Sequence, residues 1–181
     1  MPFESARAHR RYLKLTPHWV PEVSAWPRSL QSVSLSSGVL TFFHHQLGAA
    51  PAYRSGPVFG SWEAEGEQLR VVCAAMAGYL PWAEYDPEQP FALQAEYVLG
   101  WTDALRATVS PEIDWVGQWL ALPVGVGGHA EETRQVKQAA ALQLVDAHRP
   151  LLVLQPPGDG PRTHAYVFEE GARSLDVQER M

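Results

Sequence analysis

The stretch that decides the predicted fold is Tyr97-Val98-Leu99-Gly100-Trp101-Thr102-Asp103-Ala104-Leu105. Its apolar residues continue a run that starts at Leu93, and we interpret Leu93 to Trp101 as a β-strand. The strand ends in a Gly-Trp pair, and Asp103 and Leu105 follow at alternating positions. This stretch therefore predicts a strand that is followed by one acidic and one apolar side chain.

Upstream of this stretch, the pattern predicts a strand, a helix and two more strands. Val33 and Leu35 alternate with serines, as in a half-buried strand, and a helix is expected from Ser37 to Leu47. Tyr53 to Trp62 and Gln68 to Ala75 are interpreted as strands. This half of the chain therefore contributes mainly strands.

Downstream, serine followed by proline at Ser110 has the form of a helix start, and we expect that helix to run to Leu120. A second helix is expected from Glu131 to His148, with acids in its first turn. Leu151 to Leu154 reads as a strand buried on both faces, and Thr163 to Phe168 as its hairpin partner. The predicted fold class is α+β, with a mixed sheet flanked by helices.

Length and composition set the domain organisation. The 181 residues fit one domain, expected at residues 30–170, with an N-terminal arm at 1–29 and a polar tail at 171–181. A net charge of -6 argues against nucleic acid or an anionic membrane as the main partner. One cysteine and no apolar run long enough to cross a bilayer predict a cytoplasmic protein with no membrane contact.

Three local patterns in this order resemble the JAB/MPN domain, also called the JAMM superfamily. Tyr53 to Gly60 resembles the Glu-x-x-Gly strand of that family, Tyr97 to Trp101 resembles its metal-site strand, and Ser110 to Asp114 resembles its Ser-x-x-Asp helix start. The resemblance spans Leu30 to Phe168. It implies a cytidine-deaminase-like sheet flanked by helices.

The same resemblance implies that the usual chemistry of the family is lost. In an active member, a strand glutamate acts as base for a zinc-bound water, and a His-x-His pair and an aspartate bind the zinc. Tyr53 stands at the glutamate position, and Asp103 and Leu105 stand at the histidine positions. Asp114 lies one residue beyond the aspartate position that Ser110 defines. We therefore expect no bound metal, no cofactor and no catalytic residues of the family type.

A few other side chains are considered for catalysis. Asp103, Asp114 and Glu96 are the acidic candidates for a relocated active site, and His129 is considered with them. His129 and His164 are each isolated in the sequence, and an ordinary structural role is expected for both.

Three hypotheses for function follow. The first is a catalytically inactive JAB/MPN-like domain that acts as a protein-binding or assembly module, because inactive relatives pair with other subunits. The alternative is a hydrolase of the isopeptidase or peptidase type with relocated residues. The third is an unrelated α+β domain with an accidental resemblance.

A partner or self-association surface is predicted in the loop from Tyr79 to Phe91. Its aromatic residues lie among prolines and offer apolar area that loses little entropy on binding. The candidate contact residues are Tyr79, Trp82, Tyr85 and Phe91. In the other interpretation, these aromatics fold back and cover the sheet.

Overall fold

The computed structural model describes residues 29–48, 53–76, 90–91, 95–155 and 162–180. The strands are β1 (Ser32–Ser36), β2 (Arg54–Glu63), β3 (Gln68–Ala74), β4 (Asp114–Ala121), β5 (Leu151–Gln155), β6 (Arg162–Phe168) and β7 (Ala172–Arg180). The α-helices are α2 (Ser37–Gly48), α3 (Ala95–Thr108) and α4 (His129–Ala141), and the short 3-10 helix η2 spans Ala64–Gly66.

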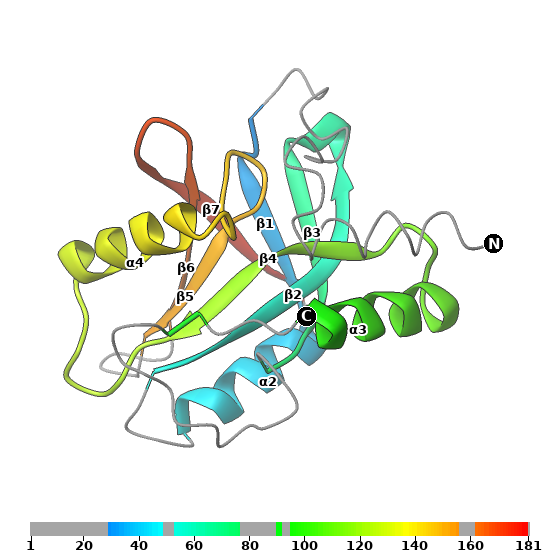
Figure 1. Ribbon diagram of the computed structural model, residues 1–181, viewed down its shortest axis with the longest axis horizontal. Coiled ribbons are helices and arrows are strands. Elements are labelled where there is room, and N and C mark those ends of the chain that lie inside the picture. The colour runs from blue at the N-terminus through cyan, green and yellow to red at the C-terminus, as the bar shows by residue number, and fades with distance from the viewer. Residues whose placement is uncertain (1–28, 49–52, 77–89, 92–94, 156–161, 181) are drawn as a thin grey trace.

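The strands form a closed mixed barrel in the order β1-β3-β2-β4-β5-β6-β7 (Figure 1). β1 runs parallel to β3 and to β7, and β4 runs parallel to β5, whereas the other neighbours are antiparallel. The pairing of β1 with β7 closes the barrel. The expectation of a JAB/MPN-like sheet flanked by helices is therefore wrong. β1 and β7, which would be the edge strands of an open sheet, pair with each other and close a barrel.

Apolar residues are buried on both faces of the central strands. Along β5, Leu152 and Leu154 belong to a core cluster that α2 covers through Val39 and Phe43, while Leu151 and Val153 contribute to a second cluster under α4. This alternation follows from the two-residue period of a strand. The prediction that Leu151 to Leu154 is a strand buried on both faces is confirmed.

The predicted strand from Leu93 to Trp101 is wrong, because Ala95–Thr108 forms α3. Val98, Trp101 and Leu105 recur at helical spacing and pack with Phe59 and Trp115 in a third apolar cluster. The apolar run is thus one stripe of an amphipathic helix. Gly100 lies on its exposed side.

The predicted helix from Ser110 to Leu120 is also wrong, since Asp114–Ala121 forms β4 between β2 and β5. Val116 and Trp119 face the cluster that α2 covers, and Trp115 and Leu120 are buried on the other face. An apolar segment buried on both sides has no single face, so its spacing cannot distinguish a strand from a helix.

The two other predicted helices are found, with one change of length. The helix expected from Ser37 is α2, and the helix expected to run from Glu131 to His148 ends at Ala141. Gln143 has a φ of 59°, and Asp146 accepts hydrogen bonds from the backbone N–H groups of His148 and Arg149. The residues after Ala141 therefore form a compact turn rather than helix.

The two ends of the chain differ from the expected arm and tail. Residues 172–180 form β7 rather than a tail, and residues 1–28 lie outside the described part of the chain. Within the described ranges, none of the helices has the length and apolar character needed to cross a membrane.

Candidate functional site

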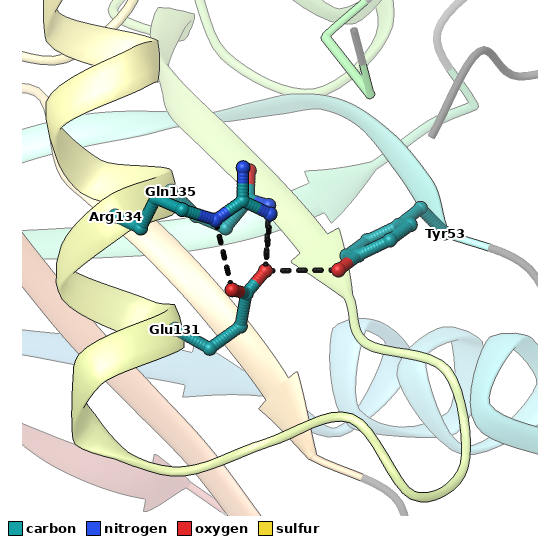
Figure 2. Close-up of polar contacts among 4 residues, drawn as sticks. All are labelled: Tyr53, Glu131, Arg134 and Gln135. Atoms are coloured by element: carbon teal, nitrogen blue, oxygen red, sulfur yellow. Dashed lines mark hydrogen bonds and ion pairs between the residues drawn. The ribbon is translucent and has the colours of Figure 1, made fainter. Parts of the chain in front are cut away.

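Polar side chains gather where the start of β2, the end of β4 and the start of α4 meet. Arg54 pairs with Ala121 in the sheet, so Tyr53 lies beside the residues that follow β4. Pro123 to Gly128 then lead into α4, and Gly125 and Gly128 adopt the positive φ angles that favour glycine. This geometry brings the first turn of α4 to Tyr53 (Figure 2).

Glu131 is the centre of this site, which we call the Glu131 site and define as Tyr53, Glu131, Arg134 and Gln135. The Tyr53 hydroxyl donates to Glu131 Oε1 at 2.8 Å, and Gln135 Nε2 donates to the same oxygen at 2.9 Å. Arg134 makes a two-pronged ion pair, from Nε to Oε2 at 2.9 Å and from Nη2 to Oε1 at 2.7 Å (Figure 2). The carboxylate therefore accepts four hydrogen bonds.

The environment keeps Glu131 ionised and Tyr53 protonated. The hydrogen bonds from Arg134 lower the pKa of Glu131 to about 2, against an opposing effect of burial, and the bonds from Gln135 and Tyr53 add to the decrease. Burial raises the pKa of Tyr53, and the hydrogen bond to the Glu131 carboxylate raises it further. A carboxylate with so low a pKa is a poor base near neutral pH.

The next residue of α4, Glu132, points into the protein and is 2% exposed. Its carboxylate accepts hydrogen bonds from Gln155 Nε2 and the Tyr166 hydroxyl, and its Oε1 lies 3.0 Å from His164 Nδ1. Burial, followed by the contact with Glu132, strongly raises the pKa of the Tyr166 phenol. Two neighbouring acids thus anchor α4 to different parts of the barrel.

The structure places the acidic candidates, and the residues that matched the JAB/MPN motif positions, in different parts of the protein. Asp103 is exposed on α3, and Leu105 is buried in the apolar cluster beneath that helix. Ser110 lies in the turn before β4, where its Oγ accepts a hydrogen bond from a backbone N–H at 3.4 Å. Asp114 begins β4, and its Oδ1 accepts from the backbone N–H of Trp115 at 2.7 Å.

Tyr53 and Asp114 lie at opposite ends of the β2–β4 pairing. Arg54 pairs with Ala121 and Gly60 pairs with Asp114, so six residues of strand, roughly 20 Å, separate the two positions. The acid that meets Tyr53 is Glu131 instead. Glu96 belongs to α3, but its side chain is not among those described.

The aromatic loop is described in part. Tyr79, Trp82 and Tyr85 lie outside the described residues. Phe91 is 7% exposed and packs in the cluster under α4 with Leu120 and other apolar residues. For Phe91, this agrees with the interpretation in which the aromatics fold back onto the sheet.

Sequence reasoning missed Glu131 and Glu132 as site residues. The available signal was a pair of acids in the first turn of a helix that follows a glycine-rich break, and it was interpreted only as a favourable interaction with the helix dipole. His129 is exposed at the start of α4, and His164 contacts Glu132. Across the described residues, no three His, Cys, Asp or Glu side chains are placed to hold a metal ion.

Comparison with known proteins identifies a similar fold. No protein-family model matches the chain, and no curated protein matches it. Protein DSY2949 of Desulfitobacterium hafniense, known from a solution structure, is similar with a TM-score of 0.56 and 15% sequence identity. The match covers 82% of this chain and 92% of that protein's chain. At this identity the likeness concerns the fold alone, and the resemblance of the sequence to the JAB/MPN family stays a prediction.

Proposed function

We propose that this chain is a catalytically inactive protein-binding or assembly module. The observation that carries the proposal is the state of Glu131, the acid at the meeting point of β2, β4 and α4. Its charge is neutralised by Arg134, and its oxygens already accept hydrogen bonds from Tyr53 and Gln135. A carboxylate held in this way is a poor general base and a poor metal ligand.

The apolar surroundings of the site support the same proposal. Leu120 in β4 and Leu122, which follows the strand, are both buried in the cluster against which Tyr53 packs. Aliphatic side chains and a protonated phenol offer no ligand for zinc and no group that activates water.

A second candidate function is a hydrolase with relocated residues, and one observation favours it. The buried Glu132 carboxylate faces His164 Nδ1, while the His164 side chain is 39% exposed. A carboxylate that holds Nδ1–H leaves Nε2 free to accept a proton, which is the role of histidine in many hydrolases.

The two candidates are separated by metal content and by activity. For the inactive module, we expect the purified chain to hold no stoichiometric zinc after exhaustive dialysis, and to cleave neither peptide nor isopeptide substrates with zinc added. About one zinc per chain, removed by Asp103→Ala or Glu131→Gln, would overturn the proposal. Cleavage abolished by His164→Asn but not by the exposed control His129→Asn would establish the hydrolase instead.

The binding role needs a separate experiment. Partners captured by cross-linking in the native host are to be identified and then mixed with the chain as purified proteins. We expect light scattering to detect a complex that a metal chelator does not dissociate. A chain that stays monomeric with every purified candidate would contradict the binding role.

A further inference from the structure

The inner face of the first turns of α4 contains a buried acceptor that is not used. Gln135 is 0% exposed, and its Nε2 donates to Glu131 Oε1 at 2.9 Å. Its amide oxygen, Oε1, has no hydrogen-bond partner in the described structure. Because a buried acceptor without a donor costs free energy, this oxygen is suited to a group that brings a donor to it.

The negative charge in contact with Gln135 is that of Glu131, which accepts a hydrogen bond from the Gln135 amide and is paired with Arg134. Glu131 is four residues before Gln135 and Glu132 is three before it, so all three side chains emerge from adjacent positions of the helix. In the described part of the site, Arg134 supplies the permanent positive charge, and it is bound to Glu131. Glu132 contacts Gln155, Tyr166 and His164 instead, on β5 and β6.

The site already holds one guanidinium. Arg134 donates from Nε and Nη2 to the two oxygens of Glu131, and its side chain is 50% exposed (Figure 2). Rotation of this side chain into solvent would free the Glu131 carboxylate without moving the helix. A cation from outside could then approach Glu131 and the neighbouring Gln135.

We propose that the inner face of the first turns of α4 binds a protonated nitrogen, the ammonium of lysine or the guanidinium of arginine on a protein partner, which donates to Gln135 Oε1. Glu131, once released from Arg134, balances its charge. The inference rests on the proposed function, since it names the group of the partner that the binding module recognises.

The test uses NMR titrations of the full chain with methylammonium and methylguanidinium. Tetramethylammonium serves as the control, because it has the same charge and no N–H donor. We expect saturable shifts of the Gln135 side-chain amide signal with the first two probes and none with the third. Equal shifts with tetramethylammonium, or no saturation with any probe, would overturn the proposal.

Two matched pairs of variants locate the site. Gln135→Met removes the free acceptor and should weaken binding at least about tenfold, whereas Gln138→Met, on the same helix, should leave binding unchanged. Arg134→Ala frees Glu131 and should tighten binding several-fold, whereas Lys137→Ala removes the same charge from an exposed position and should not. If Gln135→Met fails to fold, the second pair decides, and equal affinities for Arg134→Ala and Lys137→Ala would refute the inference.

The source of the cation is settled with short peptides. A peptide with a single internal lysine or arginine should bind at least as tightly as the free probe, and its norleucine counterpart should not bind. If the free probes bind and the peptides do not, the site is one for small amines, and the protein-partner proposal is overturned. Cleavage of peptide or isopeptide substrates would refute the proposed function but not the cation site. A chain that is inactive and binds no cation would refute the cation site but not the proposed function.

Discussion

Tyr53 and Glu131 are 78 residues apart in the sequence, and the Tyr53 hydroxyl donates a 2.8 Å hydrogen bond to Glu131 Oε1. The bond joins the residue before β2 to the first turn of α4 (Figure 2). Glu132, the next residue, joins the same turn to β5 and β6 through Gln155 and Tyr166. The start of α4 is thus fixed on two sides by consecutive carboxylates.

The first prediction concerns the pH dependence of the Glu131 contribution. Its pKa falls from 4.5 to about 2 on folding, so its stabilisation is complete above pH 4.5 and is lost as the pH falls toward 2. Glu131→Gln should lower the free energy of unfolding at pH 7 by about 1 kcal/mol or less, because the partner Arg134 is half exposed. Urea denaturation between pH 7 and pH 3 should show the gap to the native chain narrowing below about pH 4.5.

The control for this titration is Glu112→Gln, at an exposed position in the turn before β4. It should change the free energy of unfolding by less than about 0.5 kcal/mol at every pH. A constant gap for Glu131→Gln from pH 7 to pH 3 would contradict the prediction.

The second prediction concerns Glu132. Glu132→Ala leaves the buried Tyr166 hydroxyl and the Gln155 amide without their acceptor, and should lower the free energy of unfolding by about 3 kcal/mol. Chemical denaturation at pH 7 measures the change, with the exposed Glu112→Ala as control. A loss of the same size in both variants would show that the buried contacts contribute nothing.

The third prediction contrasts two glycines. A Cβ on Gly56 would lie 2.0 Å from the backbone oxygen of Ala75 and 2.9 Å from Trp119 Nε1, so Gly56→Ala should cost about 3 kcal/mol through displacement of the strands. Gly100, in α3, has no heavy atom within 4 Å of its Cβ position, and Gly100→Ala should stabilise by about 0.5–1 kcal/mol. Thermal unfolding distinguishes the two, and a melting temperature that rises for both would refute the close approach at Gly56.

The fourth prediction concerns closure of the barrel. β7 pairs with β1 and β6, and its Leu175 and Val177 pack against the main core cluster. Removal of residues 172–181 would leave two strands with unpaired edges, and we expect the truncated chain to lose its cooperative unfolding transition. A chain that lacks Met181 alone is the control. A truncated chain that melts cooperatively at the native temperature would show that β7 is dispensable.

Part of the fold could be predicted from local signals. The helix that begins at Ser37 has a serine at its start, apolar residues at helical spacing and a glycine at its end, and these act within a few residues of one another. The strand Leu151 to Leu154 is short, continuously apolar and preceded by a proline. For these two elements, the signals that decide the structure lie within the element or directly beside it.

Two predictions were wrong for the same physical reason: α3 was expected to be a strand and β4 a helix. The apolar residues of α3 fit a helical stripe, and those of β4 are buried on both faces, yet each segment on its own is compatible with either structure. Burial decides between them, and burial depends on which other segments pack nearby. A family motif placed on Gly100 and Trp101 therefore assigned ligand positions to a helix, where Asp103 is exposed and Leu105 is buried.

The sequence by itself determined which ionisable side chains this protein has, and it indicated one helix and several of the strands correctly. It also showed that aspartate and leucine, at positions 103 and 105, stand where the JAB/MPN pattern has histidines. Only the tertiary structure decided that β7 meets β1, that Glu131 rather than Asp114 faces Tyr53, and that Gln135 is buried with an unused oxygen. These are contacts between residues far apart in the chain. Their formation depends on how the whole barrel closes, which no local pattern of residues encodes.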